Sequence, residues 1–240
     1  KLFTKYEVKA GQDYWAGRFA KTYPRVEFQD LATTNAFFET IHRRFYQNLN
    51  EKMHLHTNEF YEDYANDPVL KERMDFIDEY INDPDDLLSV GVFSIVEGAI
   101  LYSTFAYFKH YQSQGKNKIK AFVSGINFSA KDENVHSQAG AYTFRVHLHQ
   151  MKLTPEAQEA LFAKIYKAAE KLREHEHHIC DKLFEKGRVE GITANQLKNF
   201  VDSRIDLCLE QLGMSAVYKP SSNPIAEWFY LGLSNAKIHD

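Results

Sequence analysis

The sequence predicts an all-α protein that forms one large domain over residues 1–240. Proline and glycine residues separate long segments, and the apolar–polar alternation typical of strands is rare within those segments. Thr154 directly precedes Pro155, which is a common pattern at a helix start. Thr193 begins another helical run, and Gly213 ends it. These helix signals and the scarcity of strand patterns define the expected fold class.

Composition excludes several classes of protein before any motif is considered. The chain has 44% hydrophobic residues and a formal net charge of −4. It is too apolar to be disordered, and it lacks the basic character that nucleic-acid binding favours. Cys180 and Cys208 cannot form a disulfide framework or a cysteine-only zinc site. Because the first residues also lack an apolar signal core, we expect a reducing, cytoplasmic location.

One segment, residues 87–108, is mainly apolar, is diluted by glycine, serine and threonine, and carries a single charge, Glu97. A membrane span needs about 20 apolar residues, so its length alone permits one. The charge lies in mid-segment and no basic cluster flanks the run, so we expect the central helix of a soluble bundle and no membrane partner. A buried glutamate needs a cationic partner, which is either a basic side chain or a metal ion.

Glutamate and histidine recur at a spacing that places both on one helix face. A glutamate is followed three positions later by a histidine at four places: 39/42, 51/54, 133/136 and 174/177. Chance accounts for about one such pair, so the neighbouring residues decide between them. The first and third pairs have apolar or small neighbours and are candidate metal ligands. The second and fourth lie in polar stretches that are typical of exposed helix faces.

Helix length predicts that Glu97 and Glu133 lie opposite each other. Glu97 is about 15 residues before the turn expected at 112–117, and Glu133 is about 16 residues after it. At 1.5 Å per residue, both legs of an antiparallel hairpin are then about 23 Å long.

The same reasoning applied to the start of the chain finds a partner for Glu39. The turn expected at 22–25 lies about 15 residues after Glu7 and about 14 residues before Glu39. Asp13 is the alternative, but it would miss the level of Glu39 by about 9 Å. Glu7 is therefore the better candidate for the fourth carboxylate.

The resulting set contains four carboxylates and two imidazoles from two hairpins. Its members are Glu7, Glu39, His42, Glu97, Glu133 and His136. Such a set is typical of ferritin-like di-iron and dimanganese carboxylate proteins. We therefore expect a ferritin-like helical bundle with a di-metal site in its core. Oxygen-rich ligands favour iron or manganese over structural zinc, so two iron ions, two manganese ions or a mixed pair would fit.

With these residues placed, the sequence resembles the small, radical-generating subunit of class I ribonucleotide reductase. Three segments carry the resemblance: FFETIHRRFY, SIVEGAILYSTF and KDENVHSQ. The resemblance implies the six metal ligands given above, with Glu7 in the place of the first carboxylate. It also implies that Tyr46 stores the radical and that Phe105 forms an apolar wall around it. Asp132 would orient a metal-bound histidine and lie on the electron-transfer path.

The residues around Tyr46 independently suit this role. Tyr46 is four positions after His42 and seven after Glu39, so all three share one helical face. A phenoxyl radical needs a dry surrounding, and the apolar side chains expected to supply it are Phe45, Leu101 and Phe105. Tyr102 is a nearby tyrosine, but its spacing from Glu97 turns it away from the ligand face.

The resemblance further implies a ribonucleoside-diphosphate reductase whose small subunit activates O₂ and supplies a tyrosyl radical for deoxyribonucleotide synthesis. The expected partners are a large catalytic subunit, which binds the nucleotide, and a second copy of this chain. Family members also carry a tryptophan-bearing N-terminal segment and a tyrosine-bearing C-terminal tail. Trp15 and Trp228 do not fit the tryptophan's place, and the sequence reads to Asp240 without such a tail, so we expect both segments to be absent.

Two other functions use the same type of metal centre. One is a di-iron oxygenase or oxidase that acts on a small substrate, and the other is a ferritin-like iron-storage protein. Tyr46 together with Asp132 favours the reductase, because a storage protein has no need of either residue at these positions.

Overall fold

A computed structural model of the chain describes residues 1–234, and it confirms the all-α prediction. Across these residues the regular structure is helical, apart from one isolated bridge between Val189 and Ile192. The chain divides into two compact units, Lys1–Val90 and Gly91–Asp240, and each is described by itself below. A single domain over the whole chain stays a prediction.

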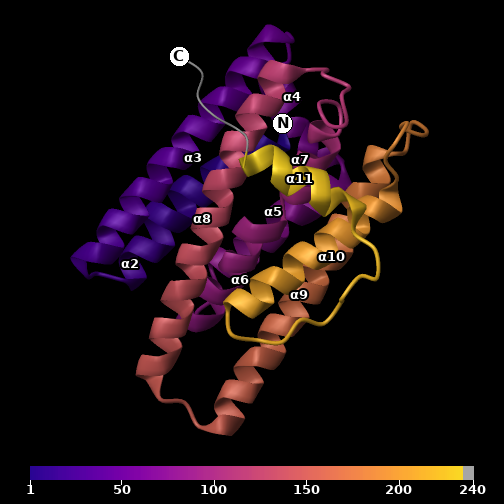
Figure 1. The fold of residues 1–240 in the computed structure, drawn as a ribbon. Coiled ribbons are helices and arrows are strands. Elements are labelled where there is room, and N and C mark those ends of the chain that lie inside the picture. The colour runs from indigo at the N-terminus through magenta and orange to yellow at the C-terminus, as the bar shows by residue number, and fades with distance from the viewer. Residues whose placement is uncertain (235–240) are drawn as a thin grey trace. The chain divides into compact units, whose positions relative to one another are not determined.

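The first unit is built on a helical hairpin (Figure 1). Its first arm consists of α1 (Leu2–Val8), the π-helix η1 (Lys9–Phe19) and α2 (Ala20–Thr22), which follow one another directly. The second arm is the long helix α3 (Val26–Lys52), which packs along α1 and η1. Pro24 lies in the turn between the two arms, as the sequence predicts.

Three shorter helices complete the first unit. They are α4 (Asn58–Glu62), the 3₁₀ helix η2 (Asp63–Asn66) and α5 (Pro68–Ile81). The Asp67 side chain caps α5 by accepting hydrogen bonds from two backbone amides, and Pro68 occupies the first helical position. α5 packs against η1.

An aromatic cluster fills the core beside η1. Tyr14, Trp15 and Phe19 are all at most 1% exposed. The rings of Trp15 and Phe19 lie 4.9 Å apart, and the ring of Tyr14 meets Trp15 edge-on at 5.1 Å. Burial of this much aromatic surface anchors the first arm of the hairpin.

The second unit continues the apolar segment and then returns along it. α6 (Asp86–Ala99) crosses the division between the units, and α7 (Tyr102–Lys109) follows after a break. The chain then reverses into α8 (Lys120–Met151), the longest helix. The sequence predicts one continuous helix over residues 87–108, whereas in the structure the helix is broken at Ile100 and Leu101.

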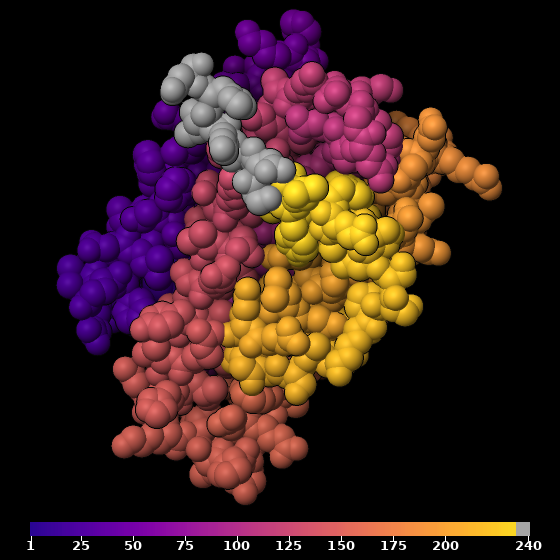
Figure 2. Space-filling model, in the orientation of Figure 1, coloured from indigo at the N-terminus to yellow at the C-terminus, as the bar shows by residue number. Residues whose placement is uncertain are grey.

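Three further helices pack on this hairpin. They are α9 (Pro155–Leu183), α10 (Ala194–Gln211) and α11 (Pro224–Ser234). The hydroxyls of Thr154 and Thr193 cap α9 and α10, which confirms both predicted helix starts. Figure 1 shows α8 and α9 as a long hairpin with α10 beside α9. Figure 2 shows α11, in yellow, at the surface beside α10.

The apolar segment is buried, as expected for the central helix of a soluble bundle. Among the described residues, Asp86–Lys109 is the one stretch long and apolar enough to cross a membrane by length and composition. Yet 94% of its most apolar window lies inside the protein. A membrane-facing helix would expose these side chains, so the segment behaves as a core element.

Candidate metal centre

The first unit gathers three of the predicted ligands. Glu7 lies on α1, whereas Glu39 and His42 share one face of α3. The Nδ1 atom of His42 is 3.1 Å from a Glu39 carboxylate oxygen and 3.6 Å from a Glu7 carboxylate oxygen. One ligand atom from each of the three side chains lies within 4.8 Å of the other two. All three residues are at most 3% exposed, so the set is a buried one.

A glycine allows the two arms of this hairpin to approach closely at the ligands. A Cβ atom at Gly11 would lie only 2.9 Å from the Cβ atom of Glu39. Any side chain at position 11 would therefore push η1 away from α3. Asp13, the alternative carboxylate, instead pairs with Lys9 at 3.1 Å and is about half exposed. Glu7 is thus the acidic residue of this arm that lies beside Glu39.

The second unit gathers the other three predicted ligands. Glu97 lies in the last turn of α6, and Glu133 and His136 share one face of α8. The Nδ1 atom of His136 is 3.2 Å from a Glu133 carboxylate oxygen and 3.9 Å from a Glu97 carboxylate oxygen. Ligand atoms of these three residues also lie within 4.8 Å of one another. Each residue is at most 1% exposed.

A reciprocal pair of hydrogen bonds holds α6 against α8 beside these ligands. The Ser94 hydroxyl donates to the Ser137 carbonyl at 2.7 Å, and the Ser137 hydroxyl donates to the Ser94 carbonyl at 2.8 Å. A Cβ atom at Gly98 would overlap the Ser137 hydroxyl and the Cys208 sulfur. The close contact that brings Glu97 beside Glu133 therefore depends on a residue without a side chain.

The donor chemistry of each set fits a divalent cation. Each set contains two buried carboxylates and one imidazole, so two acidic groups lie in a buried region where an uncompensated charge is costly. A divalent ion balances two carboxylates, and carboxylate-rich sites with one imidazole suit iron or manganese. The two sets have the same composition, so each could hold one such ion.

A family-level comparison agrees with this chemistry. The family model for the ribonucleotide reductase small chain matches residues 3–224. The chain belongs to that family. The match includes all six candidate ligands, and it confirms the resemblance drawn from the three sequence segments.

Individual relatives are distant in sequence but share the fold. The chain is 23% identical, over 209 residues, to the ribonucleoside-diphosphate reductase subunit beta of Halalkalibacterium halodurans. That match covers 82% of this chain and 59% of the relative, so the chain spans little more than half of the relative's length.

Two solved structures have the same arrangement of helices. One is a Bacillus halodurans chain described as a class I ribonucleotide reductase, with a TM-score of 0.80, 21% identity, and coverage of 96% of this chain and 83% of that chain. The other is the dimanganese(II)-NrdF of Streptococcus sanguinis, with a TM-score of 0.74, 20% identity, and coverage of 95% and 80%. Both support a ribonucleotide reductase small-chain fold.

Tyr46, the family's candidate radical residue, lies on α3 one turn beyond His42. It is 2% exposed. The ring of Phe3 stacks on it, with centroids 4.5 Å apart, and the ring of Phe45 meets it edge-on at 5.1 Å. Phe45 was predicted from the sequence to lie beside Tyr46, whereas Phe3 was not. Phe3 is four positions before Glu7, so its place on the ligand face of the first helix was the available signal.

The remaining predicted site residues lie in the second unit. Asp132 directly precedes Glu133 on α8 and is half-buried. Phe105 is fully buried on α7, where its ring meets Tyr102 edge-on at 5.6 Å. Leu101, which was expected to exclude water, lies buried at the break between α6 and α7. Their catalytic roles stay predictions.

The two polar glutamate–histidine pairs lie at the surface. Glu51 and His54 are exposed. Glu174 is exposed as well, while His177 forms a 2.8 Å hydrogen bond with Asp202. Burial alone would raise the pKa of the Asp202 carboxyl, but hydrogen bonds from His177 and Arg173 hold that pKa below its usual range.

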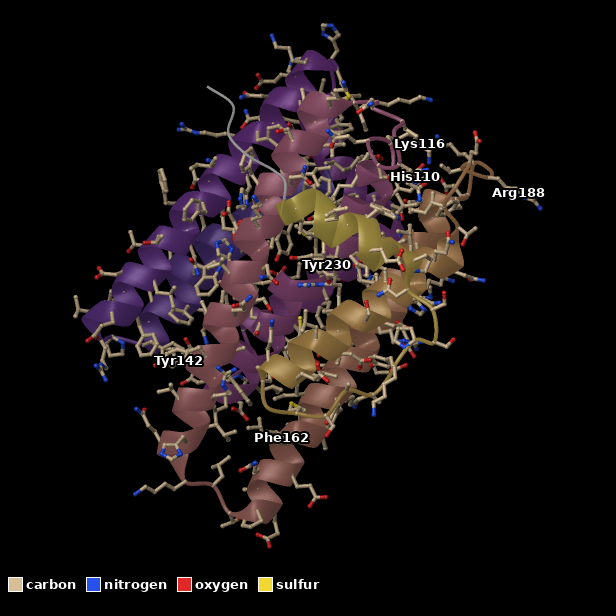
Figure 3. All side chains as sticks on the ribbon, in the orientation of Figure 1. His110, Lys116, Tyr142, Phe162, Arg188 and Tyr230 are labelled. Atoms are coloured by element: carbon tan, nitrogen blue, oxygen red, sulfur yellow. The ribbon has the colours of Figure 1, made fainter. Side chains whose placement is uncertain are left out.

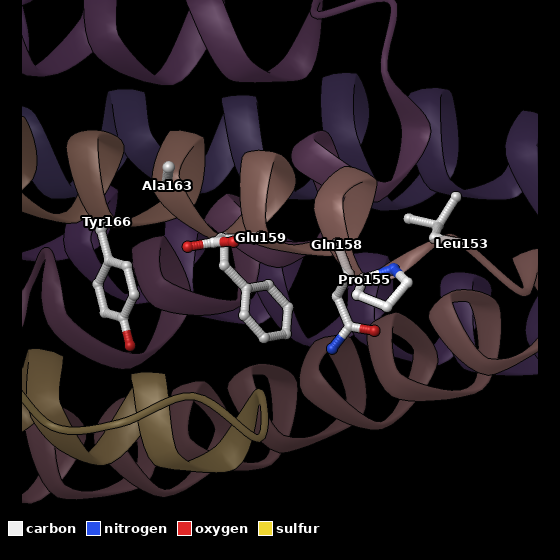
Figure 4. Close-up of a pocket in the computed structure, with 7 residues that line it drawn as sticks. Leu153, Pro155, Gln158, Glu159, Ala163 and Tyr166 are labelled. Atoms are coloured by element: carbon white, nitrogen blue, oxygen red, sulfur yellow. The ribbon is translucent and has the colours of Figure 1, made fainter.

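The described surface pockets lie elsewhere in the second unit. The larger, of about 540 Å³, is an open depression along the start of α9 (Figure 4). Its lining consists of Leu153, Pro155, Gln158, Glu159, Phe162, Ala163 and Tyr166. A second depression of about 480 Å³ shares part of this lining. Neither depression is lined by a predicted site residue.

Proposed function

We propose that this chain is the small subunit of a class I ribonucleoside-diphosphate reductase. In this proposal the two buried ligand sets together hold two metal ions. The observation that carries it is that both units of a family member repeat one arrangement, a lone glutamate beside a glutamate–histidine pair on an adjacent helix. Two iron ions are the expected occupants. Two manganese ions or a mixed pair suit the same donors, and one structural neighbour is a dimanganese protein.

A di-metal centre of this type supplies O₂ activation and one-electron oxidising power when it is bound. The chain's own residues provide the conditions for it. Four carboxylates balance the charge of the ions, and the two histidines supply neutral donors. Burial of all six side chains keeps bulk water from competing for the ions.

Tyr46 is the residue that stores the oxidising equivalent in this proposal. It gives up one electron and its phenolic proton, which leaves a neutral phenoxyl radical. The stacked ring of Phe3 and the edge of Phe45 shield the phenol from water and from reductants. Phe105 contributes apolar surface in the second unit. Asp132, next to Glu133, orients the metal-bound histidine and carries electron transfer.

The proposal includes two protein partners and a cytoplasmic location. A large catalytic subunit binds the ribonucleotide and receives the radical equivalent for deoxyribonucleotide synthesis.

A second copy of this chain packs on the exposed face of α3, where Phe37 and Ile41 are 61% and 45% exposed, one helical turn apart. Sedimentation at micromolar concentration should show a dimer, and Phe37→Glu should shift it towards a monomer of 27.9 kDa. Met151→Glu, at another exposed apolar position, is the matched control.

One loading experiment separates the candidate functions. The purified protein is given Fe(II) and air, or Mn(II), and then examined by metal analysis, optical spectroscopy and EPR. A bound metal pair with a tyrosyl EPR signal, and deoxynucleotide formation after addition of the large subunit, are expected. Oxidation of a small substrate without a stored radical would favour an oxygenase or oxidase. Uptake of many iron ions per chain would favour iron storage.

A further inference from the structure

Arg204 on α10 is a buried cation that connects four separate elements of the second unit. It is 1% exposed. Its Nε atom donates to the Gly98 carbonyl at 2.9 Å, and its Nη1 atom donates to the Tyr230 hydroxyl oxygen at 2.9 Å. Its Nη2 atom donates to the Asn134 side-chain carbonyl at 3.4 Å. The guanidinium lies over the Tyr102 ring, 3.9 Å from the ring centroid.

Two of these contacts are made to the residues that directly follow metal-ligand candidates. Gly98 follows Glu97, and Asn134 follows Glu133. The Gly98 carbonyl lies in the last turn of α6, where carbonyl groups lack partners within their own helix. Arg204 supplies that partner just before the break at Ile100 and Leu101. One side chain thus contacts both helices that carry the second ligand set.

The composition of this contact is unusual for a buried arginine. Within residues 1–234, the groups that contact the guanidinium are a backbone carbonyl, an amide, a phenol and an aromatic ring, and no carboxylate forms an ion pair with it. An apolar side chain would fill the same space without the cost of burying a charge. A planar group with several donors is needed, however, to bond neighbouring helices in fixed directions.

The contact with Tyr230 extends this network to the surface. Tyr230 lies on α11 and is 39% exposed (Figure 3). Its hydroxyl oxygen accepts the hydrogen bond from Arg204, so a displacement of α11 changes a contact of the residue that holds Gly98. The neighbouring Phe229 is fully buried against Phe200 and Tyr102, which fixes α11 on the same cluster.

We propose that Arg204 is a positioning residue, which sets the placement of Glu97 and Glu133 and couples that placement to α11 through Tyr230. The proposal rests on the proposed function, because it assumes that Glu97 and Glu133 bind metal. Arg204 itself contacts no candidate ligand side chain in the described structure. It acts through the backbone next to Glu97 and through the side chain next to Glu133.

Metal binding by matched variants tests the proposal. Arg204→Met keeps side-chain length but removes every donor, and Arg204→Lys keeps the charge but loses the planar group. Arg173→Met is the control, because Arg173 also lies over a tyrosine ring, that of Tyr218, in the same unit. Mn(II) titration followed by EPR should show at least tenfold weaker binding and an altered spectrum for both Arg204 variants. The control should bind as the wild type does.

Tyr230→Phe tests the coupling to α11 without removing the arginine. It deletes only the hydroxyl that accepts from Arg204. We expect a smaller loss of Mn(II) affinity, about two- to fivefold, with a spectral change in the same direction. Wild-type affinity and spectrum in Tyr230→Phe would overturn the coupling, even if both Arg204 variants failed to fold. Wild-type binding in a folded Arg204→Met would overturn the positioning role.

Hydrogen exchange in the metal-free protein separates this inference from the proposed function. Backbone amides of residues 100–103 should exchange at least tenfold faster in Arg204→Met than in Arg173→Met. Equal exchange rates would overturn the positioning role whether or not metal binds. Failure of the wild-type chain to bind Mn(II) or Fe(II) would instead overturn the proposed function.

Discussion

The ring of Phe3 stacks face to face on the ring of Tyr46, with an interplanar angle of 18°. Phe3 lies on the first helix and Tyr46 on α3, so the stack joins the two arms of the first hairpin. It covers one face of the phenol at the same time. Shielding of the candidate radical therefore depends on the same contact that closes the hairpin around Glu7, Glu39 and His42.

Loss of this stack should shorten the life of the radical more than it weakens metal binding. Phe3→Ala opens one face of Tyr46 to water and small reductants, whereas the three ligands of the first unit remain. We expect the half-life of the tyrosyl EPR signal to fall at least tenfold, with metal content unchanged. Val26→Ala, at an exposed position at the start of α3, is the control. An unchanged half-life in Phe3→Ala would show that the stack is only a packing contact.

Tyr46→Phe should remove the radical while leaving the fold and the metal. The substitution deletes one oxygen and nearly conserves volume, so the free energy of unfolding should change by less than about 1.5 kcal/mol. Metal should stay bound, because Glu39 and His42 are unaltered. We expect no stable tyrosyl signal and no deoxynucleotide formation with the large subunit. Loss of metal would indicate that Tyr46 supports the site structurally.

Tyr102 should not replace Tyr46 as the radical site. Its phenol donates to the Ala130 carbonyl, which is a poor proton acceptor, and the Arg204 cation lies on its ring. Burial raises the pKa of the phenol. The poor acceptor and the raised pKa oppose loss of the proton, and the cation opposes loss of the electron. A Tyr102→Phe variant should therefore keep the EPR signal, and its disappearance would contradict the assignment to Tyr46.

Glu97→Ala should abolish occupancy of at least one metal position. The change removes one of two buried carboxylates in the second ligand set, so the remaining charge no longer balances a divalent ion. The helical circular dichroism should stay close to that of the wild type. Metal analysis of the purified variant provides the measurement, with Glu174→Ala at the surface as the control. Two full equivalents per chain in Glu97→Ala would contradict the ligand assignment.

Gly98→Ala should destabilise the protein by about 1–3 kcal/mol, in the range expected for overpacking a core. The added methyl group overlaps the Cys208 sulfur and the Ser137 hydroxyl, and both belong to packed helices. Chemical denaturation of the metal-free variant measures the loss. Gly232→Ala is the control, because the nearest atom there is the flexible end of Lys109. Equal stability of the two variants would show that α6 can move away from α8 without cost.

Lys109 should make stability depend on pH above neutrality. Burial lowers the pKa of its ammonium from 10.5 to about 7. Between these values the unfolded chain binds the additional proton, so the free energy of unfolding should rise with pH. Relative to Lys109→Met, the wild type should gain about 2 kcal/mol between pH 7 and pH 9. Urea denaturation at both pH values checks this, with exposed Lys120→Met as the control. A constant difference would contradict the lowered pKa.

Helical spacing and hairpin length in the sequence were sufficient to predict which candidate ligands lie together within each unit. The three-residue spacing placed Glu39 with His42 and Glu133 with His136, because helix geometry is local. Equal hairpin legs then paired Glu7 with Glu39 and Glu97 with Glu133. Distances within each unit agree with this arrangement, although the binding of metal by these residues stays a proposal.

Features that depend on tertiary packing could not be found in this way. The π-helix η1 packs against α3 and α5 and has no distinctive composition, so its wider turn could not be predicted from the residues. The break at Ile100 and Leu101 lies in a segment whose apolar residues predict a continuous helix. The contacts of Arg204 join residues as far apart as Gly98 and Tyr230, and no local pattern indicates them.

Two glycines bear on any attempt to transplant this centre into a designed scaffold. Gly11 lies against Glu39, and Gly98 follows Glu97, so beside each ligand set an added side chain would overlap a side chain of a packed neighbouring helix. Copying six side chains onto helices at ordinary spacing would hold the carboxylates too far apart. A designer would have to copy the close helix contacts at Gly11 and Gly98 together with the ligands. The smallest portable form of the centre therefore includes positions that never contact the metal.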